Sequence, residues 1–269
     1  MQEKFSLWQV LVLAVVQGVT EFLPVSSDGH LAIVEPLIWT SSGRPPPSMD
    51  LTIILHLGTL GSILVFYRDR ILRLLGEDRR VIWLLMIGTA PAVALVLTAK
   101  LLLDEVFEPI LKSTFLAGLM LPVTGAALIW SEGRPAGNRD YRELSWLDSL
   151  IIGIAQAAAI LPGLSRSGST IAAGLALKMS RTAAATFSFL LAIPALAGAG
   201  AYEGLKMLRH PAPLSASPVN LAIGAVVSFA IGVVAINLLQ RVLLSGRLHW
   251  FGWYCIALGA IVAVMNWPR

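Results

Sequence analysis

Residues 147–177 read LDSLIIGIAQAAAILPGLSRSGSTIAAGLAL. An apolar arm at 147–164 ends in a polar break rich in Pro, Gly, Ser and Arg, and a second apolar arm follows at 170–177. A helix needs roughly 20 residues to cross a hydrocarbon core about 30 Å thick, so the second arm is too short to span it. The pattern predicts a re-entrant helical hairpin, which dips into the membrane and returns to the same side.

Residues 7–39 follow the same plan. An apolar arm at 7–25 breaks between Pro24 and His30, and a short apolar run follows at 31–39. With an ungapped offset of 139 residues, Ser6 coincides with Ser145, Gln17 with Gln156, Ser26 with Ser165, and Gly29 with Gly168. We therefore predict two copies of one unit.

Six further apolar stretches are long enough, or nearly so, to cross the membrane as helices. They run approximately 51–67, 81–103, 114–130, 183–205, 217–240 and 250–267. Each half then holds one hairpin and three spans, and because three is odd, the second half lies upside down relative to the first. The sequence predicts an all-α polytopic membrane protein with six transmembrane helices and two re-entrant helical hairpins. It forms a single membrane domain, 1–269, built as an inverted repeat with pseudo-repeats at about 1–132 and 140–269.

The composition excludes a soluble globular protein. The 269 residues are 56% hydrophobic and 13% charged, whereas soluble domains carry about 25% charged residues. The net charge of +4 fits basic residues that flank membrane spans, so we expect no nucleic-acid partner. The tryptophans fall near predicted span ends, as in an interfacial belt: Trp8, Trp39, Trp83, Trp130, Trp146, Trp250, Trp253 and Trp267.

Basic residues are shared unevenly between the two sides of the membrane. The loops at 68–80 and 131–146, with shorter segments near Arg181 and Arg241, hold more Lys and Arg than the opposite side. The richer side is expected to be cytoplasmic. Both termini and the first hairpin then face outward, and the second hairpin enters from the cytoplasm.

The first hairpin carries a buried acid beside a hydroxyl-rich turn. Glu21 lies in an apolar helix, where a carboxylate costs about 2.5–3.5 kcal/mol and needs a partner. Gln17 lies one helical turn earlier on the same face. Ser26, Ser27 and His30 follow, and they supply the hydroxyls and the imidazole that a nucleophile and its acid–base partner require. The alternative is that Gln17 and Glu21 only hold helices together.

Arg166 is the only charged residue in the segment 151–177, so it needs an anionic partner. Its planar guanidinium suits phosphate oxygens, and a short helix starting near Ser169 directs its positive end to the same place. The break adds glycines that expose backbone N–H groups and hydroxyls that donate hydrogen bonds: Gly163, Ser165, Ser167, Gly168 and Thr170. We predict a phosphate-binding loop, and the alternative is a structural ion pair between Arg166 and Glu21.

Three other polar residues have structural interpretations. His56, in an apolar stretch, is expected to be a helix-packing residue. Glu35 and Asp50 lie near predicted helix ends, where solvated or capping roles are usual. None of the three enters the predicted site.

The two breaks resemble the signature motifs of the bacterial undecaprenyl-diphosphate phosphatase family, which is known for bacitracin resistance. The motifs are Gln17-x-x-x-Glu21, Ser26-Ser27-x-Gly29-His30 and Pro162-Gly163-x-Ser165-Arg166-Ser167-x-x-Thr170. The resemblance covers essentially the whole chain, and it includes the runs Leu55-His56-Leu57-Gly58-Thr59 and Phe187-Ser188-Phe189-Leu190-Leu191.

The resemblance implies a bacterial inner-membrane enzyme that removes the terminal phosphate of undecaprenyl diphosphate and returns the monophosphate carrier to peptidoglycan synthesis. Glu21, His30 and Arg166 fall on family-essential positions, and Ser27 falls on the suggested nucleophile. The positions expected to bind substrate or phosphate are Ser26, Gly163, Ser165, Ser167, Gly168 and Thr170.

The resemblance also implies a divalent cation, Mg²⁺ or Ca²⁺, for which Glu21 and Gln17 are the expected ligands. Family members can carry Glu at the position of Gln17, and an amide there coordinates a cation but is no base. Asp28 stands where a small polar residue is expected, so it either adds a metal ligand or repels the substrate's charge.

The main alternative is a secondary transporter or lipid-carrier flippase, because inverted repeats with broken helices describe transporters equally well. The hydroxyls and the histidine around Arg166 exceed what simple anion binding needs, which favours the enzyme. A purely structural scaffold would leave Arg166 and Glu21 without a purpose. The expected partners are undecaprenyl diphosphate and membrane lipids, a homodimer is left open, and the cavity is expected to open to the periplasm.

Overall fold

The computed structural model describes residues 4–39, 49–135, 137–209 and 213–267. Within these residues, six helices are long and apolar enough to cross a membrane. They are α3 (Met49–Phe66), α5 (Arg79–Leu102), α7 (Thr114–Glu132), α10 (Arg181–Arg209), α11 (Pro218–Ser245) and α12 (Leu248–Met265). Each coincides with a predicted apolar stretch. The prediction of an all-α, multi-pass membrane protein is therefore confirmed.

The two predicted breaks each join a pair of shorter helices. The first pair is α1 (Leu7–Thr20) and α2 (Ser27–Ile38), and the second is α8 (Trp146–Ala158) and α9 (Arg166–Ala176). The 14 residues of α1 extend about 21 Å, which is less than a hydrocarbon core of about 30 Å. That each pair enters and leaves the membrane on the same side stays a prediction. Short elements connect the longer ones: α4 (Arg68–Leu74), α6 (Asp104–Leu111) and the 3-10 turn η1 (Tyr141–Glu143).

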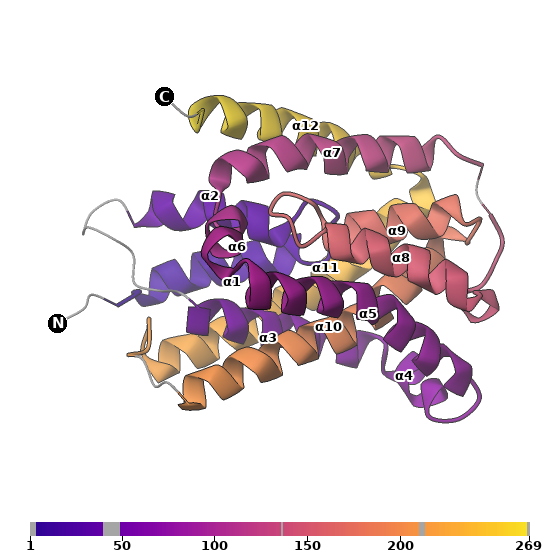
Figure 1. Cartoon of the computed structure of the whole chain (residues 1–269), viewed down its shortest axis with the longest axis horizontal. Coiled ribbons are helices and arrows are strands. Elements are labelled where there is room, and N and C mark those ends of the chain that lie inside the picture. Colours follow the sequence, from indigo (N-terminus) through magenta and orange to yellow (C-terminus); the bar gives the residue numbers. More distant parts are fainter. Residues whose placement is uncertain (1–3, 40–48, 136, 210–212, 268–269) are drawn as a thin grey trace.

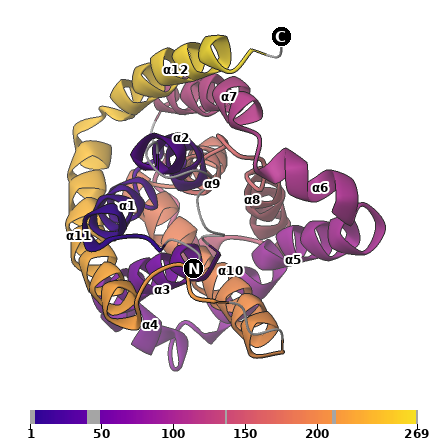
Figure 2. The ribbon, with the colours of Figure 1, turned by 90° about the vertical axis from the view of Figure 1, so that its left-hand side faces the viewer.

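The short helix pairs approach each other from opposite ends of the bundle. Figure 1 shows α1 and α2 at the end that holds both chain termini, and α8 and α9 toward the other end. Seen end on, α2 and α9 lie inside a ring of longer helices (Figure 2). The two breaks therefore come together in the interior of the bundle.

The two pairs pack against long helices in matching ways, α1 along α11 and α8 along α5. Both contacts depend on a glycine. A Cβ on Gly18 would lie 2.8 Å from Ile231 Cβ, and a Cβ on Gly153 would lie 2.4 Å from the carbonyl oxygen of Gly88. Small residues let membrane helices approach this closely. Each pair is thereby fixed to the outer ring along its first helix.

Both pairs also begin with the same helix cap. The backbone N–H of Ser6 donates to Gln9 Oε1 at 2.8 Å, and that of Ser145 donates to Asp148 Oδ2 at 2.8 Å. These serines, and their partners, stand at the same offset of 139 residues that relates the two breaks. The two caps match at this offset, while the repeat and the inversion of one half relative to the other stay predictions.

The second helix of each pair begins earlier than the sequence indicates. Ser26 and Ser165 are N-caps whose side chains accept the N–H groups of Gly29 at 3.3 Å and Gly168 at 3.1 Å. Such a cap satisfies an N–H that has no partner within the helix. As a result α9 starts at Arg166 rather than near Ser169. The motif residues that follow each cap therefore lie in a first helical turn, not in a loop.

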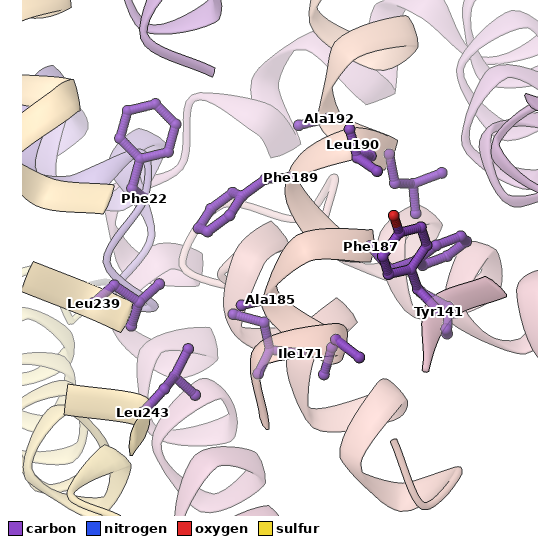
Figure 3. Packing of buried hydrophobic residues seen from close by; sticks show 14 of the residues in the cluster. Phe22, Tyr141, Ile171, Ala185, Phe187, Phe189, Leu190, Ala192, Leu239 and Leu243 are labelled. Carbon is purple, nitrogen blue, oxygen red and sulfur yellow. The ribbon is translucent and has the colours of Figure 1, made fainter. Parts of the chain in front are cut away.

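A core of buried apolar side chains extends from α10 to both breaks (Figure 3). Phe22, directly after Glu21, packs edge to face on Phe189 of α10 with ring centroids 5.6 Å apart. Ile171 of α9 belongs to the same cluster. The apolar packing therefore holds the two breaks against one central helix.

Trp39 departs from the predicted tryptophan belt. Its side chain is 5% exposed, and its ring packs edge to face on Phe5 with centroids 4.9 Å apart. The other seven tryptophans are exposed or partly exposed, as expected of an interfacial belt. Trp39 instead packs the C-terminal end of α2 against the N-terminal segment at Phe5.

Candidate active site

Glu21 follows the last residue of α1 and is 7% exposed. Its Oε2 accepts a hydrogen bond from Ser27 Oγ at 2.8 Å and another from Gln17 Nε2 at 3.1 Å. Gln17 belongs to α1, and Ser27 begins α2. The break between the two helices thus brings the candidate acid into direct contact with the candidate nucleophile.

The same carboxylate binds Arg166 of the second pair. Arg166 Nη2 donates to Glu21 Oε1 at 2.5 Å, and Nη1 donates to the Ser188 carbonyl of α10 at 3.5 Å. This ion pair is the alternative that the sequence left open for Arg166. It joins the two breaks and compensates two charges that are costly in apolar surroundings. The Arg166 side chain remains 17% exposed, so it is also accessible to a ligand.

His56 of α3 is a further partner of Glu21, and the sequence analysis missed it. His56 Nε2 lies 3.7 Å from Glu21 Oε2, and Nδ1 donates to the Thr52 carbonyl at 2.8 Å. Because a carbonyl only accepts, Nδ1 carries the proton in neutral His56 and Nε2 is the nitrogen that faces the acid. We had interpreted His56 as a packing residue, although it lies in a run that extends the family resemblance.

His30 uses both ring nitrogens for contacts other than Ser27. Its Nδ1 donates to the Ser26 carbonyl at 2.8 Å, and its Nε2 lies 2.8 Å from the Tyr254 hydroxyl of α12. We expected His30 to handle the Ser27 proton, but the Ser27 hydroxyl donates to Glu21. Tyr254 was not identified from the sequence, because a tyrosine in an apolar span is typical of membrane interfaces.

The hydroxyls of Ser165 and Ser167, at the start of α9, contact other groups of the protein. Ser165 Oγ accepts the Gly168 N–H at 3.1 Å and lies 3.2 Å from Ser167 Oγ. Ser167 Oγ also donates to the Leu23 carbonyl of the first break at 3.4 Å. Both serines are 1% exposed. The sequence predicted phosphate-binding hydroxyls here, whereas the structure uses them to cap α9 and to join the two breaks.

Thr170 is engaged in the same way. Its Oγ1 donates to the Arg166 carbonyl at 2.8 Å and lies 2.6 Å from Ser188 Oγ of α10. Ser188 is therefore a residue that holds both Thr170 and Arg166 in place, and the sequence analysis noted it only within a family-like run. The groups left to bind an anion are the Arg166 guanidinium and the backbone N–H groups of Arg166 and Ser167, since the Gly168 N–H is taken by the Ser165 cap.

Thr124 of α7 anchors the second break, and the sequence analysis did not identify it. Its Oγ1 donates to the Gly163 carbonyl at 2.9 Å and accepts the Ser165 N–H at 2.9 Å. Gly163 has φ of 92°, a conformation that favours glycine. A Cβ there would lie 2.3 Å from the Ala117 carbonyl oxygen. Gly163, predicted to contact substrate, is thus required by its packing on α7.

The two breaks contact each other reciprocally. A Cβ on Gly29 would lie 3.4 Å from Gly163 Cα, and a Cβ on Gly168 would lie 3.3 Å from Pro24 Cβ. At the 139-residue offset, Gly29 matches Gly168 and Pro24 matches Gly163, so each contact is the counterpart of the other. The first turns of α2 and α9 therefore lie against one another.

Ser26 has a strained backbone at the centre of the site. Its φ is 70° and its ψ is 100°, whereas its counterpart Ser165 has φ of −72°. A non-glycine residue in such a conformation costs on the order of 1–3 kcal/mol, and such residues cluster at functional sites. The Ser26 side chain caps α2 and its carbonyl binds His30, so the strained residue positions both.

The oxygen donors around Glu21 fit a hard cation in part. Among the described residues, no group of three or more His, Cys, Asp or Glu is placed to hold a metal. Gln17 Oε1, however, is buried without a hydrogen-bond partner in the described structure. Mg²⁺ needs only one or two protein carboxylates when phosphates supply other ligands. Asp28 is exposed in the first turn of α2, where a carboxylate also favours the helix.

The fold is that of a polytopic membrane protein, and its interior holds a buried acid that contacts an arginine, a serine and a histidine. Comparison with known families identifies which one. The family described as "Bacitracin resistance protein BacA" matches residues 10–261, and the chain belongs to this family.

Curated relatives match almost their entire length. A protein of Rhodopirellula baltica is 47% identical over 258 residues, which is 96% of this chain and 97% of the relative. One from Mycobacterium leprae is 38% identical over 275 residues, covering 97% and 94%. One from Methanosphaera stadtmanae is 36% identical over 279 residues, covering 95% and 96%. All three are named undecaprenyl-diphosphatase.

Proposed function

We propose that this protein hydrolyses undecaprenyl diphosphate to undecaprenyl phosphate and inorganic phosphate, and so recycles the lipid carrier for peptidoglycan synthesis. The observation that carries the proposal is the contact of Glu21 with both Ser27 and Arg166. It joins a candidate nucleophile and a candidate phosphate-binding cation through one carboxylate. The relatives' shared name supports the same reaction and does not favour a transporter.

The diphosphate binds between the first turns of α2 and α9. Arg166 provides a planar guanidinium with several N–H donors, and its side chain is partly exposed. The positive N-terminal end of α9 adds backbone N–H groups at the same place. The apolar surface of the long helices accommodates the isoprenoid tail in the membrane. Substrate binding thus relies on one side chain and on backbone groups rather than on the buried hydroxyls.

Ser27 attacks the terminal phosphorus, and the bond from that phosphorus to the bridging oxygen breaks, releasing undecaprenyl phosphate. The support for Glu21 as proton acceptor is its 2.8 Å hydrogen bond from Ser27. His56 lies beside the same Glu21 oxygen and is suited to pass the proton on. Water then hydrolyses the phosphoserine and restores Ser27.

Glu21 and Gln17 are the residues that would hold Mg²⁺ or Ca²⁺ together with substrate phosphates. The unpartnered Gln17 Oε1 supports this assignment. Such an ion, when bound, neutralises charge on the transferring phosphoryl group. We place the protein in the bacterial inner membrane with its site open to the periplasm, on the basis of the loop charges.

The test is phosphate release from undecaprenyl diphosphate by purified protein in detergent, where no transmembrane gradient exists. We expect release by the natural protein and a loss of about 10²-fold or more in Arg166→Lys, because lysine keeps the charge but lacks the planar fork. Arg134→Lys is the matched control, since Arg134 lies outside the site over the Trp130 ring. An absence of release by the natural protein would favour the transporter, and normal release by Arg166→Lys would overturn the role of Arg166.

A further inference from the structure

His30 of α2 contacts Tyr254 of α12. The signature motifs include His30 but not Tyr254. His30 Nε2 and the Tyr254 hydroxyl are 2.8 Å apart, and the two rings are nearly parallel, with an interplanar angle of 14° and centroids 5.7 Å apart. The residues are separated by 224 positions in the chain. Their contact is therefore created by the fold alone.

The hydrogen bonds of His30 fix which of its nitrogens can exchange a proton. The Ser26 carbonyl only accepts, so Nδ1 carries a hydrogen in both protonation states of the ring. Nε2 is then the titrating atom, and Tyr254 is its partner. A tyrosine hydroxyl both donates and accepts, so it can donate to the neutral ring and accept from the charged one. A phenylalanine at this position could do neither.

The position of Tyr254 is itself fixed by the next residue. Cys255 is fully buried, and its Sγ lies 3.8 Å from the Pro24 carbonyl of the first break. The segment of α12 that holds Tyr254 and Cys255 thus packs on the first break, between Glu21 and Ser26. Tyr254 itself is half exposed, and its hydroxyl contacts His30.

We propose that Tyr254 is a positioning residue of the site, which holds the His30 ring through Nε2 so that Nδ1 keeps the Ser26 carbonyl, and with it the turn that carries Ser27, in place during turnover. The inference rests on the proposed phosphatase function. Tyr254 acts through His30 and not on the substrate. Removal of its hydroxyl therefore lowers kcat while leaving KM nearly unchanged.

The experiment compares Tyr254→Phe with the natural protein in two measurements. Phosphate release should show kcat reduced about tenfold, the usual consequence of losing one such hydrogen bond, with KM within about twofold. Spectra that correlate ring protons with ring nitrogens, recorded on protein labelled with ¹⁵N-histidine, should show His30 protonated on Nδ1. In Tyr254→Phe the Nε2 signal should shift while Nδ1 stays protonated. His30→Asn identifies the His30 signals by their loss.

Tyr202→Phe is the matched control, because Tyr202 lies on α10 beside Lys100, outside the site. It should match the natural protein in both measurements, and unchanged thermal unfolding of Tyr254→Phe should show that its fold is intact. A kcat or a His30 Nε2 signal of Tyr254→Phe equal to that of the natural protein would overturn the proposal. A natural protein that releases no phosphate would instead overturn the proposed function, and the nitrogen spectra would still test the Tyr254–His30 contact.

Discussion

The two breaks share a backbone design but use their side chains differently. In each, a serine caps the second helix by accepting the N–H of a glycine three residues later. In the first break, Ser27, directly after the cap, donates a hydrogen bond to Glu21, which precedes the cap. In the second break, the side chains of Ser165 and Thr170 bond within their own half of the chain, whereas Arg166 and Ser167 reach the first break, at Glu21 and at the Leu23 carbonyl.

The difference lies at a few equivalent positions. At the 139-residue offset, Ser27 corresponds to Arg166, and Glu21 corresponds to Ile160, while Gln17 keeps its counterpart Gln156. One helix start therefore presents a hydroxyl, and the other presents a cation. The two breaks place two helix N-termini side by side, and the residues at equivalent positions present different groups there.

The largest difference between the breaks is expected for their hydroxyls. Ser27→Ala should lower the rate of phosphate release by about 10³-fold or more, because the nucleophile is lost. Ser167→Ala removes a hydroxyl that bonds within the protein, and it should lower the rate by no more than about tenfold. Steady-state phosphate release in detergent measures both variants.

Trapping of the intermediate separates attack by Ser27 from attack by water. Acid quenching of the natural protein during turnover, followed by mass spectrometry of the peptide that contains Ser27, should detect phosphoserine. Ser167→Ala should show the same modification at Ser27. Full activity of Ser27→Ala would exclude Ser27 as the nucleophile. The two breaks would then no longer differ by a reacting hydroxyl.

The ion pair that joins the breaks should give the next largest effect. Glu21→Gln leaves Arg166 without its anion, and we expect a loss of about 3–5 kcal/mol in the free energy of unfolding. The double variant Glu21→Gln/Arg166→Met removes both charges and should recover part of that loss. Thermal unfolding of the natural protein, Glu21→Gln, Arg166→Met and the double variant in one detergent measures the coupling. Additive losses would mean that the pair does not connect the breaks energetically.

The sequence predicts the fold well because its signals are local. Apolar length defines the six spans, and the Pro, Gly and Ser breaks define the short pairs. Glu21 and Arg166 stand out because a charge in an apolar run requires a partner. The residues around them were missed for a physical reason. Tyr254 and Thr124 reach the site from distant helices, and their side chains alone are ordinary for membrane spans.

The second break also shows that residue type alone leaves two uses open. Serines and a threonine beside an arginine suggested donors for a phosphate, but a helix start needs caps of the same chemistry. Which use applies depends on the φ and ψ angles of the cap and on the neighbouring helices. For Thr170, the partner is Ser188 of α10, so the use of its hydroxyl depends on how α9 packs against α10.

Gly163 and Gly29, which contact each other across the two breaks, should respond differently to a methyl group. Gly163→Ala places a Cβ 2.3 Å from a backbone oxygen at φ of 92°, and we expect it to destabilise the fold by about 3 kcal/mol. Gly29→Ala places a Cβ no closer than 3.2 Å to its neighbours and should cost about 1 kcal/mol or less. Thermal unfolding measures both. Equal losses would show that the break at Gly163 can relax away from α7.

The smallest expected effect is that of replacing the two N-cap serines, which should change the unfolding temperature in opposite directions. Ser26 and Ser165 are equivalent N-caps, but only Ser26 has a positive φ. Replacing either by glycine costs a few tenths of a kcal/mol in capping. At position 26, glycine also relieves backbone strain of on the order of 1 kcal/mol, so Ser26→Gly should raise the unfolding temperature. At position 165, where φ is already favourable, Ser165→Gly should lower it. A lower unfolding temperature for both variants would mean that the first break stores no strain at Ser26. The first break would then differ from the second break only in its side chains.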